Sequence, residues 1–180
     1  TDATPESLAA MAARDSGVAL LRTHRDKEAD AELAALRKWL PDPFMENGIS
    51  GFNSFRSVLT IGANLLEGEL AASRKHYDQA IAAIVKAKEI EDGLLYQEPP
   101  DWYLPTRQVL GAVLLQAKRP ADAEKYFRED LKQYRDNGWS LYGLRQALLA
   151  QNKKKAAAEE EKKYNAAFAQ ADIRISSSRY

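Results

Sequence analysis

A glycine is followed twelve residues later by an alanine at three places in this 180-residue chain. The three pairs are Gly17 with Ala29, Gly68 with Ala80, and Gly111 with Ala123. Around each pair, apolar residues recur at the three- and four-residue spacing of an amphipathic helix, and a polar turn lies between the two members. Residues this small let two helix backbones approach closely. The spacing therefore predicts a series of helical hairpins, with each glycine at a close contact between the two helices of its hairpin.

The clearest hairpin lies between Pro105 and Tyr134. Its two predicted helices carry apolar residues on one face, namely Val109, Leu110, Val113, Leu114 and Ala117 in the first, and Ala123, Phe127, Leu131 and Tyr134 in the second. The turn between them, Lys118-Arg119-Pro120, places proline at the first position of the second helix. Proline suits that position because its backbone angle is already helical and its missing N–H would have no partner there.

The same template recurs along the chain. The predicted repeats cover about residues 10–43, 61–94, 104–137 and 138–171. In the fourth repeat Arg145 stands at the glycine position, and Gly143, two residues earlier, is the candidate substitute. The second helix of this repeat, from about Lys154, is weakly apolar, as expected of a helix that closes a stack toward solvent.

Two insertions and a tail interrupt this pattern. The first insertion, residues 44–60, contains Asn47-Gly48 and Ser50-Gly51, which mark a loop, but helical spacing resumes from Phe52 and predicts an overlong helix into the second repeat. Asp92-Gly93 predicts a helix end with the glycine left-handed. The second insertion, residues 95–103, is rich in proline and aromatic residues, and residues 172–180 lose the repeat pattern and are predicted to be a C-terminal tail.

A helix-turn-helix unit of about 34 residues with small residues at these positions resembles the tetratricopeptide repeat. The resemblance extends over about residues 10–171 and implies an all-α fold, a right-handed superhelical stack of about four hairpins and eight helices. The last two repeats also resemble the carboxy-terminal part of large bacterial tetratricopeptide proteins of undefined role. That closer resemblance bears on the fold and names no activity.

The composition excludes several classes of function. Lysine and arginine together number 26, as do aspartate and glutamate, so no overall field attracts nucleic acid or an anionic membrane. The absence of cysteine excludes disulfides, thiolate metal ligands and thiol nucleophiles. No apolar run approaches the roughly 20 residues of a membrane span. A start at Thr1 without methionine is expected of a processed product or a fragment, so the sequence indicates no compartment.

Catalytic and cofactor motifs are also absent from the sequence. The two histidines, His24 and His76, fall in turns of different repeats, and no acidic residue is spaced to join them as a metal ligand. Ser50 lies between Gly48 and Gly51, which is not the spacing of a nucleophile elbow. Neither a phosphate-binding loop nor a dinucleotide fingerprint occurs. We therefore expect no enzyme activity, no metal and no cofactor.

The resemblance implies that the first helices of the hairpins line a concave groove, which suits an extended peptide or a helix. The charged, amide and aromatic residues at these groove positions form the predicted binding set: Arg14, Arg22, Glu69, Gln108, Gln116, Trp139, Tyr142 and Gln146. The alternative is that the groove positions pack on neighbouring helices or terminal segments. The lysine and asparagine clamp with which chaperone-binding members hold a peptide carboxylate is absent, since the matching pairs are Arg14 with Val18, Leu65 with Glu69, and Gln108 with Ala112.

The second insertion and the residues after it carry the densest cluster of potential anchors: Glu98, Asp101, Trp102, Tyr103 and Arg107. Tryptophan, tyrosine and arginine are the residues that anchor interfaces, so the cluster could be a binding loop. The alternative is structural, with Trp102 filling the gap that the insertion opens and Glu98 paired with Arg107. In that arrangement the next helix begins at about Asp101 to Pro105.

The sequence as a whole predicts a binding function. We expect a protein- or peptide-binding scaffold or assembly module whose partner the sequence does not identify. The alternative is a non-catalytic regulatory or substrate-positioning segment of a larger enzyme. Nothing in the sequence indicates the oligomeric state.

Overall fold

The computed structural model describes residues 16–17, 19–21, 23–49, 52–96, 98, 100–102 and 104–179. The predicted groove residues Arg14 and Arg22, and Tyr103 of the second insertion, lie outside the described residues. The chain divides into two compact units, Thr1–Tyr103 and Leu104–Tyr180. Each unit is described by itself.

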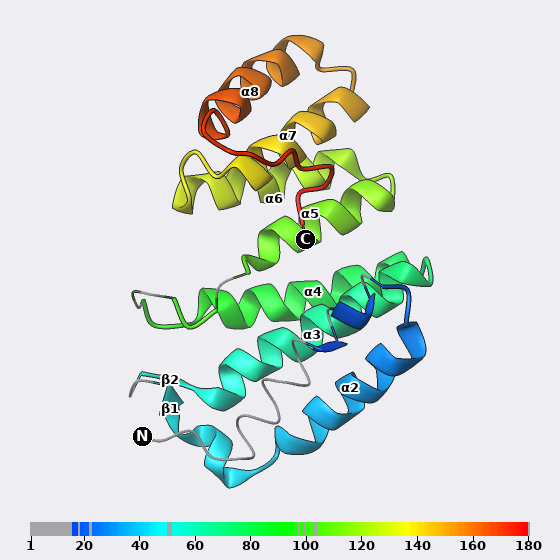
Figure 1. Cartoon of the computed structure of the whole chain (residues 1–180), viewed down its shortest axis with the longest axis vertical. Helices are drawn as coiled ribbons and strands as arrows, with labels where there is room; N and C mark the ends of the chain where they lie inside the picture. Colours follow the sequence, from blue (N-terminus) through cyan, green and yellow to red (C-terminus); the bar gives the residue numbers. More distant parts are fainter. Residues whose placement is uncertain are drawn as a thin grey trace. The chain divides into compact units, whose positions relative to one another are not determined.

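The first unit contains three long helices and a small β-hairpin. In chain order its elements are α2 (Asp26–Trp39), the short 3₁₀-helix η1 (Pro43–Glu46), β1 (Gly48–Ile49), β2 (Asn53–Ser54), α3 (Phe55–Ser73) and α4 (Tyr77–Asp92). The two strands pair antiparallel. Helix α3 begins where the Ser54 hydroxyl accepts a hydrogen bond from the Ser57 N–H (3.1 Å), and it packs beside α4 as an antiparallel hairpin (Figure 1). The predicted overlong helix is thus confirmed.

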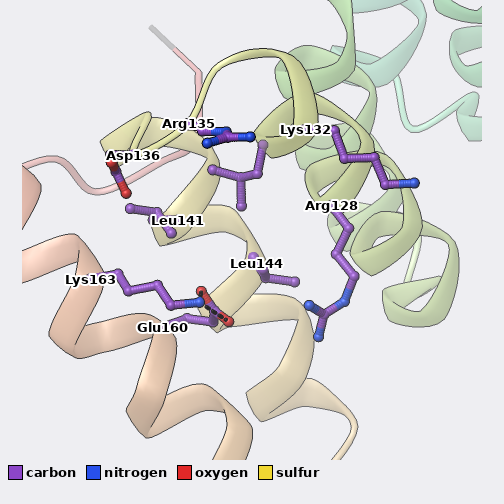
Figure 2. Close-up of a pocket in the computed structure, with 9 residues that line it drawn as sticks. Arg128, Lys132, Arg135, Asp136, Leu141, Leu144, Glu160 and Lys163 are labelled. Atoms are coloured by element: carbon purple, nitrogen blue, oxygen red, sulfur yellow. Dashed lines mark hydrogen bonds and ion pairs between the residues drawn. The ribbon is translucent and has the colours of Figure 1, made fainter.

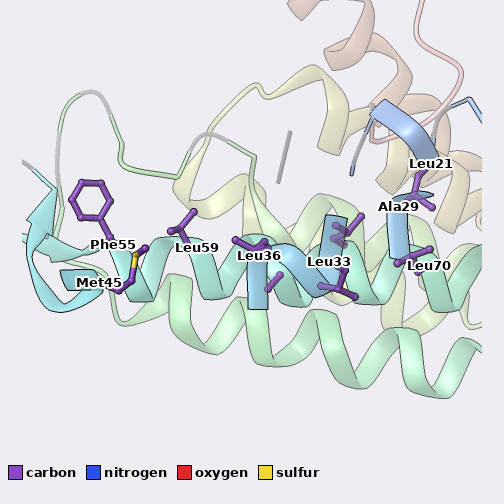
Figure 3. Packing of buried hydrophobic residues seen from close by; sticks show 10 residues of the cluster. Leu21, Ala29, Leu33, Leu36, Met45, Phe55, Leu59 and Leu70 are labelled. Atoms are coloured by element: carbon purple, nitrogen blue, oxygen red, sulfur yellow. The ribbon is translucent and has the colours of Figure 1, made fainter. Parts of the chain in front are cut away.

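The core of the first unit lies along the contact between α2 and α3 (Figure 3). Leu33 and Leu36 of α2 face Leu59 and Leu70 of α3 across this contact. Met45 of η1 is fully buried at one end of the same cluster, so the first insertion extends the core as well as lengthening the chain.

The second unit consists of two consecutive hairpins followed by an irregular segment. Its helices are α5 (Thr106–Gln116), α6 (Pro120–Gln133), α7 (Gly138–Ala150) and α8 (Lys154–Ala167). Pro120 is the first residue of α6, as predicted, and the Asn137 side chain accepts hydrogen bonds from the Trp139 and Ser140 N–H groups at the start of α7. After α8 the chain turns back across the unit toward α5 (Figure 1).

Helices dominate both units, so the all-α class is confirmed. The described residues outside them form the two short strands, turns and connecting segments. Among the described residues, no helix is both long enough and apolar enough to cross a membrane.

Four turns in the chain have the same backbone form. The left-handed residues His24, Lys75, Lys118 and Asn152 have φ of 58°, 62°, 58° and 57°. In each case the next residue donates its N–H to the carbonyl five positions earlier, at 2.8 to 2.9 Å. This pairing is the Schellman motif, which ends a helix by satisfying its last carbonyls. The four residues are 51, 43 and 34 residues apart, so the turns recur every 34 residues once the two insertions of 17 and 9 residues are set aside.

The predicted close contacts are confirmed at two of the three glycines. A Cβ at Gly68 would lie 2.4 Å from Ile84 Cγ1, and one at Gly111 would lie 2.4 Å from Phe127 Cζ, each on the second helix of the same hairpin. The prediction for Gly17 is wrong in its partner, because its nearest neighbour is Leu66 of α3.

Gly143 is close to the same phenylalanine from the other side, since a Cβ there would lie 2.3 Å from Phe127 Cζ. The Phe127 ring is therefore held between the backbones of α5 and α7, one from each hairpin of the second unit.

Gly111→Leu is expected to lower the free energy of unfolding by about 1 to 3 kcal/mol, because the added side chain must displace the buried Phe127 ring. The measurement is urea denaturation of the two proteins. Gly93→Leu is the matched control, since a Cβ at Gly93 has no neighbour closer than 3.5 Å. An unchanged midpoint for Gly111→Leu would contradict the close contact.

Several element ends differ from the sequence predictions. Gly93 ends α4 but has φ of −89° and is not left-handed. Helix α5 begins at Thr106, later than predicted, so Trp102 lies in the irregular segment before it. Helix α8 starts at Lys154 as predicted but ends at Ala167, which leaves four residues of the predicted fourth repeat outside the helix.

Candidate functional site

A groove whose helical lining is uncharged lies between α5 and α7 of the second unit. We call it the α5–α7 groove, and its helical lining is Ala112, Leu115, Gln116, Tyr142, Gly143 and Gln146. The three positions from each helix are spaced so that they share one face. Ala112 and Gly143 keep the lining low at those positions, so another backbone can approach closely.

The end of the chain occupies this groove. Residues 176–179, here called the tail segment, line the same hollow as the helical residues. The Tyr142 hydroxyl donates to the backbone carbonyl of Ser176 (3.1 Å), and Gln146 Nε2 donates to the Tyr142 oxygen (3.0 Å). Ser178 is only 3% exposed, and its hydroxyl donates to the backbone carbonyl of Gln108 at 3.5 Å. The segment predicted to be a tail is thus irregular, as expected, but it packs on the helices.

A buried polar cluster lies next to the groove. Asp130 of α6 is fully buried and accepts hydrogen bonds from the Ser140 hydroxyl and from Gln108 Nε2 (3.3 Å). Burial raises the pKa of Asp130, although both hydrogen bonds act in the opposite direction. Its second carboxylate oxygen, Oδ1, has no hydrogen-bond partner within the described part of the chain. Gln108 therefore contacts both features: its backbone carbonyl accepts from Ser178, and its side chain donates to the buried carboxylate of Asp130. The sequence analysis did not predict this cluster.

The structure brings four members of the predicted binding set together. Gln116, Tyr142 and Gln146 line the α5–α7 groove, and Gln108 contributes its backbone carbonyl while its side chain is buried. Trp139 is not in the lining, and its ring meets Phe168 edge-on at 6.5 Å between centroids.

Glu69, the remaining described member of the set, belongs to the other unit. It is 8% exposed, within α3.

In the first unit, Asn53 of the first insertion holds the second insertion in place. Its side-chain amide donates to the Leu95 carbonyl (2.9 Å) and to Asp101 Oδ2 (2.7 Å), and its oxygen accepts from the Leu95 N–H (2.8 Å). Asn53 is 7% exposed, and Trp102 beside Asp101 is 6% exposed. These contacts support the structural interpretation of Asp101 and Trp102. Nothing in the local sequence distinguishes Asn53 from an ordinary loop asparagine.

Glu98 and Arg107, the other described members of that cluster, have partners within their own units. The Tyr96 hydroxyl donates to Glu98 Oε1 (2.7 Å), and this hydrogen bond raises the pKa of Tyr96. Arg107 Nε lies 3.6 Å from Glu129 Oε2. The Glu98–Arg107 ion pair would join the two units and stays a prediction.

A second hollow in the second unit, of about 430 Å³, has a basic rim over an apolar floor (Figure 2). Lysine and arginine side chains at the rim come from α6 and the residues after it, and Leu141 and Leu144 of α7 form part of the floor. At the opposite side both Glu160 oxygens are 3.0 Å from Lys163 Nζ. The rim places positive charge beside largely buried leucine side chains, on different faces of the helices from the α5–α7 groove.

Glu124 of α6 forms hydrogen bonds within its own helix and to the turn between α7 and α8. It accepts hydrogen bonds from Arg128 Nε (2.9 Å), Gln151 Nε2 (2.9 Å) and Lys153 Nζ (2.8 Å). Burial pushes the pKa of Glu124 upward, but these three hydrogen bonds outweigh it and hold the pKa at about 2, below the ordinary value of 4.5. The carboxylate therefore joins α6 to the turn between α7 and α8.

Glu124→Gln is expected to lower the free energy of unfolding at pH 7 by about 1 to 3 kcal/mol, since the Glu124 side chain is only 15% exposed and accepts three hydrogen bonds, while solvent screens the half-exposed Arg128 and Lys153. Because the folded pKa lies below the unfolded one, the stabilisation is complete above about pH 4.5 and is lost as the pH falls toward 2. The measurement is urea denaturation of both proteins at pH 7 and near pH 2.5, with the exposed Glu159→Gln as control. An equal deficit at the two pH values would contradict this assignment.

The two histidines lie in exposed turns, as the sequence predicted. His24 is one of the left-handed turn residues, and His76 directly follows another. Within the part of the chain that the structure describes, no group of three or more histidine, aspartate or glutamate side chains is placed to hold a metal ion.

Comparison with known proteins adds no relative. No family model, no curated protein and no solved structure matches this chain. The functional conclusion depends on the contacts of the chain's own residues, and the fullest set of such contacts around a surface groove is the one that holds the tail segment.

Proposed function

We propose that the second unit is a peptide-binding module that holds a segment of a partner protein in the α5–α7 groove, as a scaffold or assembly factor. The observation that supports this function is the seating of the tail segment. Tyr142 binds a backbone carbonyl of that segment, and the Gln108 carbonyl accepts from its buried serine. A groove that contacts the main chain of one peptide segment can accept the main chain of another.

We also propose that the hairpins belong to a superhelical stack of the tetratricopeptide type. The recurrence of the same turn every 34 residues, apart from the insertions, supports this arrangement. So does the close approach at Gly68 and Gly111, which are the small positions of that repeat.

The function is tested with a defined probe, a fluorescein-labelled peptide with the sequence of residues 172–179, DIRISSSR. It is titrated into the full chain carrying Ser178→Asp, a change that disfavours the chain's own segment because a carboxylate would replace the buried hydroxyl that donates to the Gln108 carbonyl. We expect a saturable rise in fluorescence anisotropy and none with a scrambled peptide. No saturable binding at millimolar protein would contradict the proposed function.

Tyr142→Phe, added to the same protein, is the matched site variant. It keeps the ring and removes the hydroxyl that reaches the peptide carbonyl, so binding is expected to weaken by about 3- to 10-fold, the effect of one neutral hydrogen bond. Tyr126→Phe, on a different helix and outside the groove lining, is expected to leave the affinity unchanged.

A further inference from the structure

We propose that the tail segment, residues 176–179, is a tethered competitor that closes the α5–α7 groove to partner peptides and is displaced when they bind. This inference rests on the proposed function and concerns its regulation. It also defines the class of peptide that competes, namely one with a hydroxyl at the place of Ser178 that donates to the Gln108 carbonyl.

Two hydrogen bonds join the serines of the tail segment to the helices of the groove. One hydrogen bond from Tyr142 reaches the Ser176 carbonyl, and one at 3.5 Å runs from Ser178 to the Gln108 carbonyl. The backbone N–H of Arg179 is bonded within the segment, to the Ser177 hydroxyl (3.3 Å). Neutral hydrogen bonds of this kind change an equilibrium by roughly tenfold or less each. The segment is therefore seated without being fixed as firmly as a core element.

The segment also fills the groove incompletely. A hollow of about 190 Å³ remains between the tail segment and the two helices. That is room for a few water molecules, at about 30 Å³ each, or for one larger side chain. A partner peptide that places an apolar side chain against Leu115 would bury surface that the serines of the tail segment leave open.

The helical lining of the groove selects against charge. Ala112, Leu115, Gln116, Tyr142, Gly143 and Gln146 contain no ionisable group that is charged at neutral pH. A carboxylate at the Ser178 position would be buried and could not donate to the Gln108 carbonyl oxygen, which it would face, although Arg179 of the segment itself also lines the hollow. Ser178→Asp is therefore expected to disfavour the seated segment and to open the groove.

Because the tail segment is covalently connected to α8, it can occupy the groove in most molecules even if its own affinity is weak. Helix α8 ends at Ala167, nine residues before Ser176, so the segment is held close to the groove by a short connection. Short flexible linkers give effective concentrations of about a millimolar. If the free peptide binds with a Kd of about 100 µM, the tethered copy occupies the groove in about nine of ten molecules and weakens the binding of a competitor about tenfold.

The test compares three full-length proteins with the labelled peptide of residues 172–179: the unchanged chain, Ser178→Asp, and Ala171→Asp. Ala171 is exposed and upstream of the tail segment, so its substitution adds the same charge without opening the groove. We expect Ser178→Asp to bind the probe about tenfold more tightly than the unchanged chain, and Ala171→Asp to match the unchanged chain. A chain that ends at Ala171 provides a second open form and is expected to bind like Ser178→Asp.

The possible outcomes distinguish failure of the tethered competitor from failure of the proposed peptide-binding function. Equal, saturable binding by the unchanged chain and both open forms would overturn the tethered competitor while leaving the groove a peptide site. Binding by none of the proteins would overturn both. Tighter binding by Ala171→Asp to the same degree as Ser178→Asp would show an effect of added charge alone and would also overturn the competitor.

Discussion

Phe127→Ala is expected to lower the free energy of unfolding of the second unit by about 3 to 5 kcal/mol, the range for truncation of a buried aromatic ring. Phe127 is fully buried, and its Cζ atom would be 2.4 Å from a Cβ at Gly111 and 2.3 Å from one at Gly143. Removal of the ring leaves a cavity bordered by two helix backbones. Those backbones cannot collapse into it without moving the α5–α7 groove as well.

The measurement is urea denaturation with a double-mutant cycle. Gly143→Ala is expected to destabilise the unchanged protein, because its new methyl group meets the ring, but to be tolerated in the Phe127→Ala background, where the ring is gone. Tyr126→Ala, at the neighbouring half-buried position, is expected to cost clearly less. Additive effects of the Phe127 and Gly143 changes would contradict the arrangement of the ring between the two glycines.

Trp102→Ala is expected to lower the free energy of unfolding of the first unit by a similar amount, about 3 to 5 kcal/mol. Trp102 is 6% exposed although it lies in an irregular segment, and its neighbour Asp101 is bonded to Asn53. The indole therefore supplies buried surface that the second insertion would otherwise lack. Asn53→Ala is expected to cost about 1 to 3 kcal/mol, because it leaves the Leu95 N–H and carbonyl without their partner.

Both variants are compared with Tyr96→Ala, whose side chain is 83% exposed in the same insertion and whose removal is expected to change stability little. The measurement is thermal and urea unfolding of the three variants. A Trp102→Ala protein as stable as the unchanged chain would refute the structural role and would favour the interpretation of the loop as an interface.

The sequence predicted the hairpins well because the relevant signals are local. Pro120 begins α6 and Lys154 begins α8, as expected from proline at a helix start and from the recurrence of the template. Gly68 and Gly111 contact the second helix of their own hairpins at the equivalent residues Ile84 and Phe127, each 16 positions later, because both hairpins follow one template. These features depend on a few neighbouring residues and on the period of the helix.

The features that the sequence did not predict depend on residues far apart in the chain. Asn53 meets Leu95 and Asp101, which lie 42 and 48 residues away. Ser178 meets Gln108, 70 residues away, from a segment with no helical period. A hydrogen bond between an isolated asparagine or serine and a distant backbone leaves no pattern in a single sequence, because many side chains of the same type remain in solvent.

The position of the two insertions bears on how a chain of this kind can change over generations. The second lies between hairpins, and the first lies before α3 and continues into its first turns, while the four left-handed turns keep the same form. Residues can therefore be gained or lost at the irregular parts of these joints while every hairpin keeps its internal register. An inherited change in length at residues 47–54 or 95–103 would alter what the molecule displays without altering the hairpins themselves, so these joints are the places where relatives of this chain are expected to differ most in length.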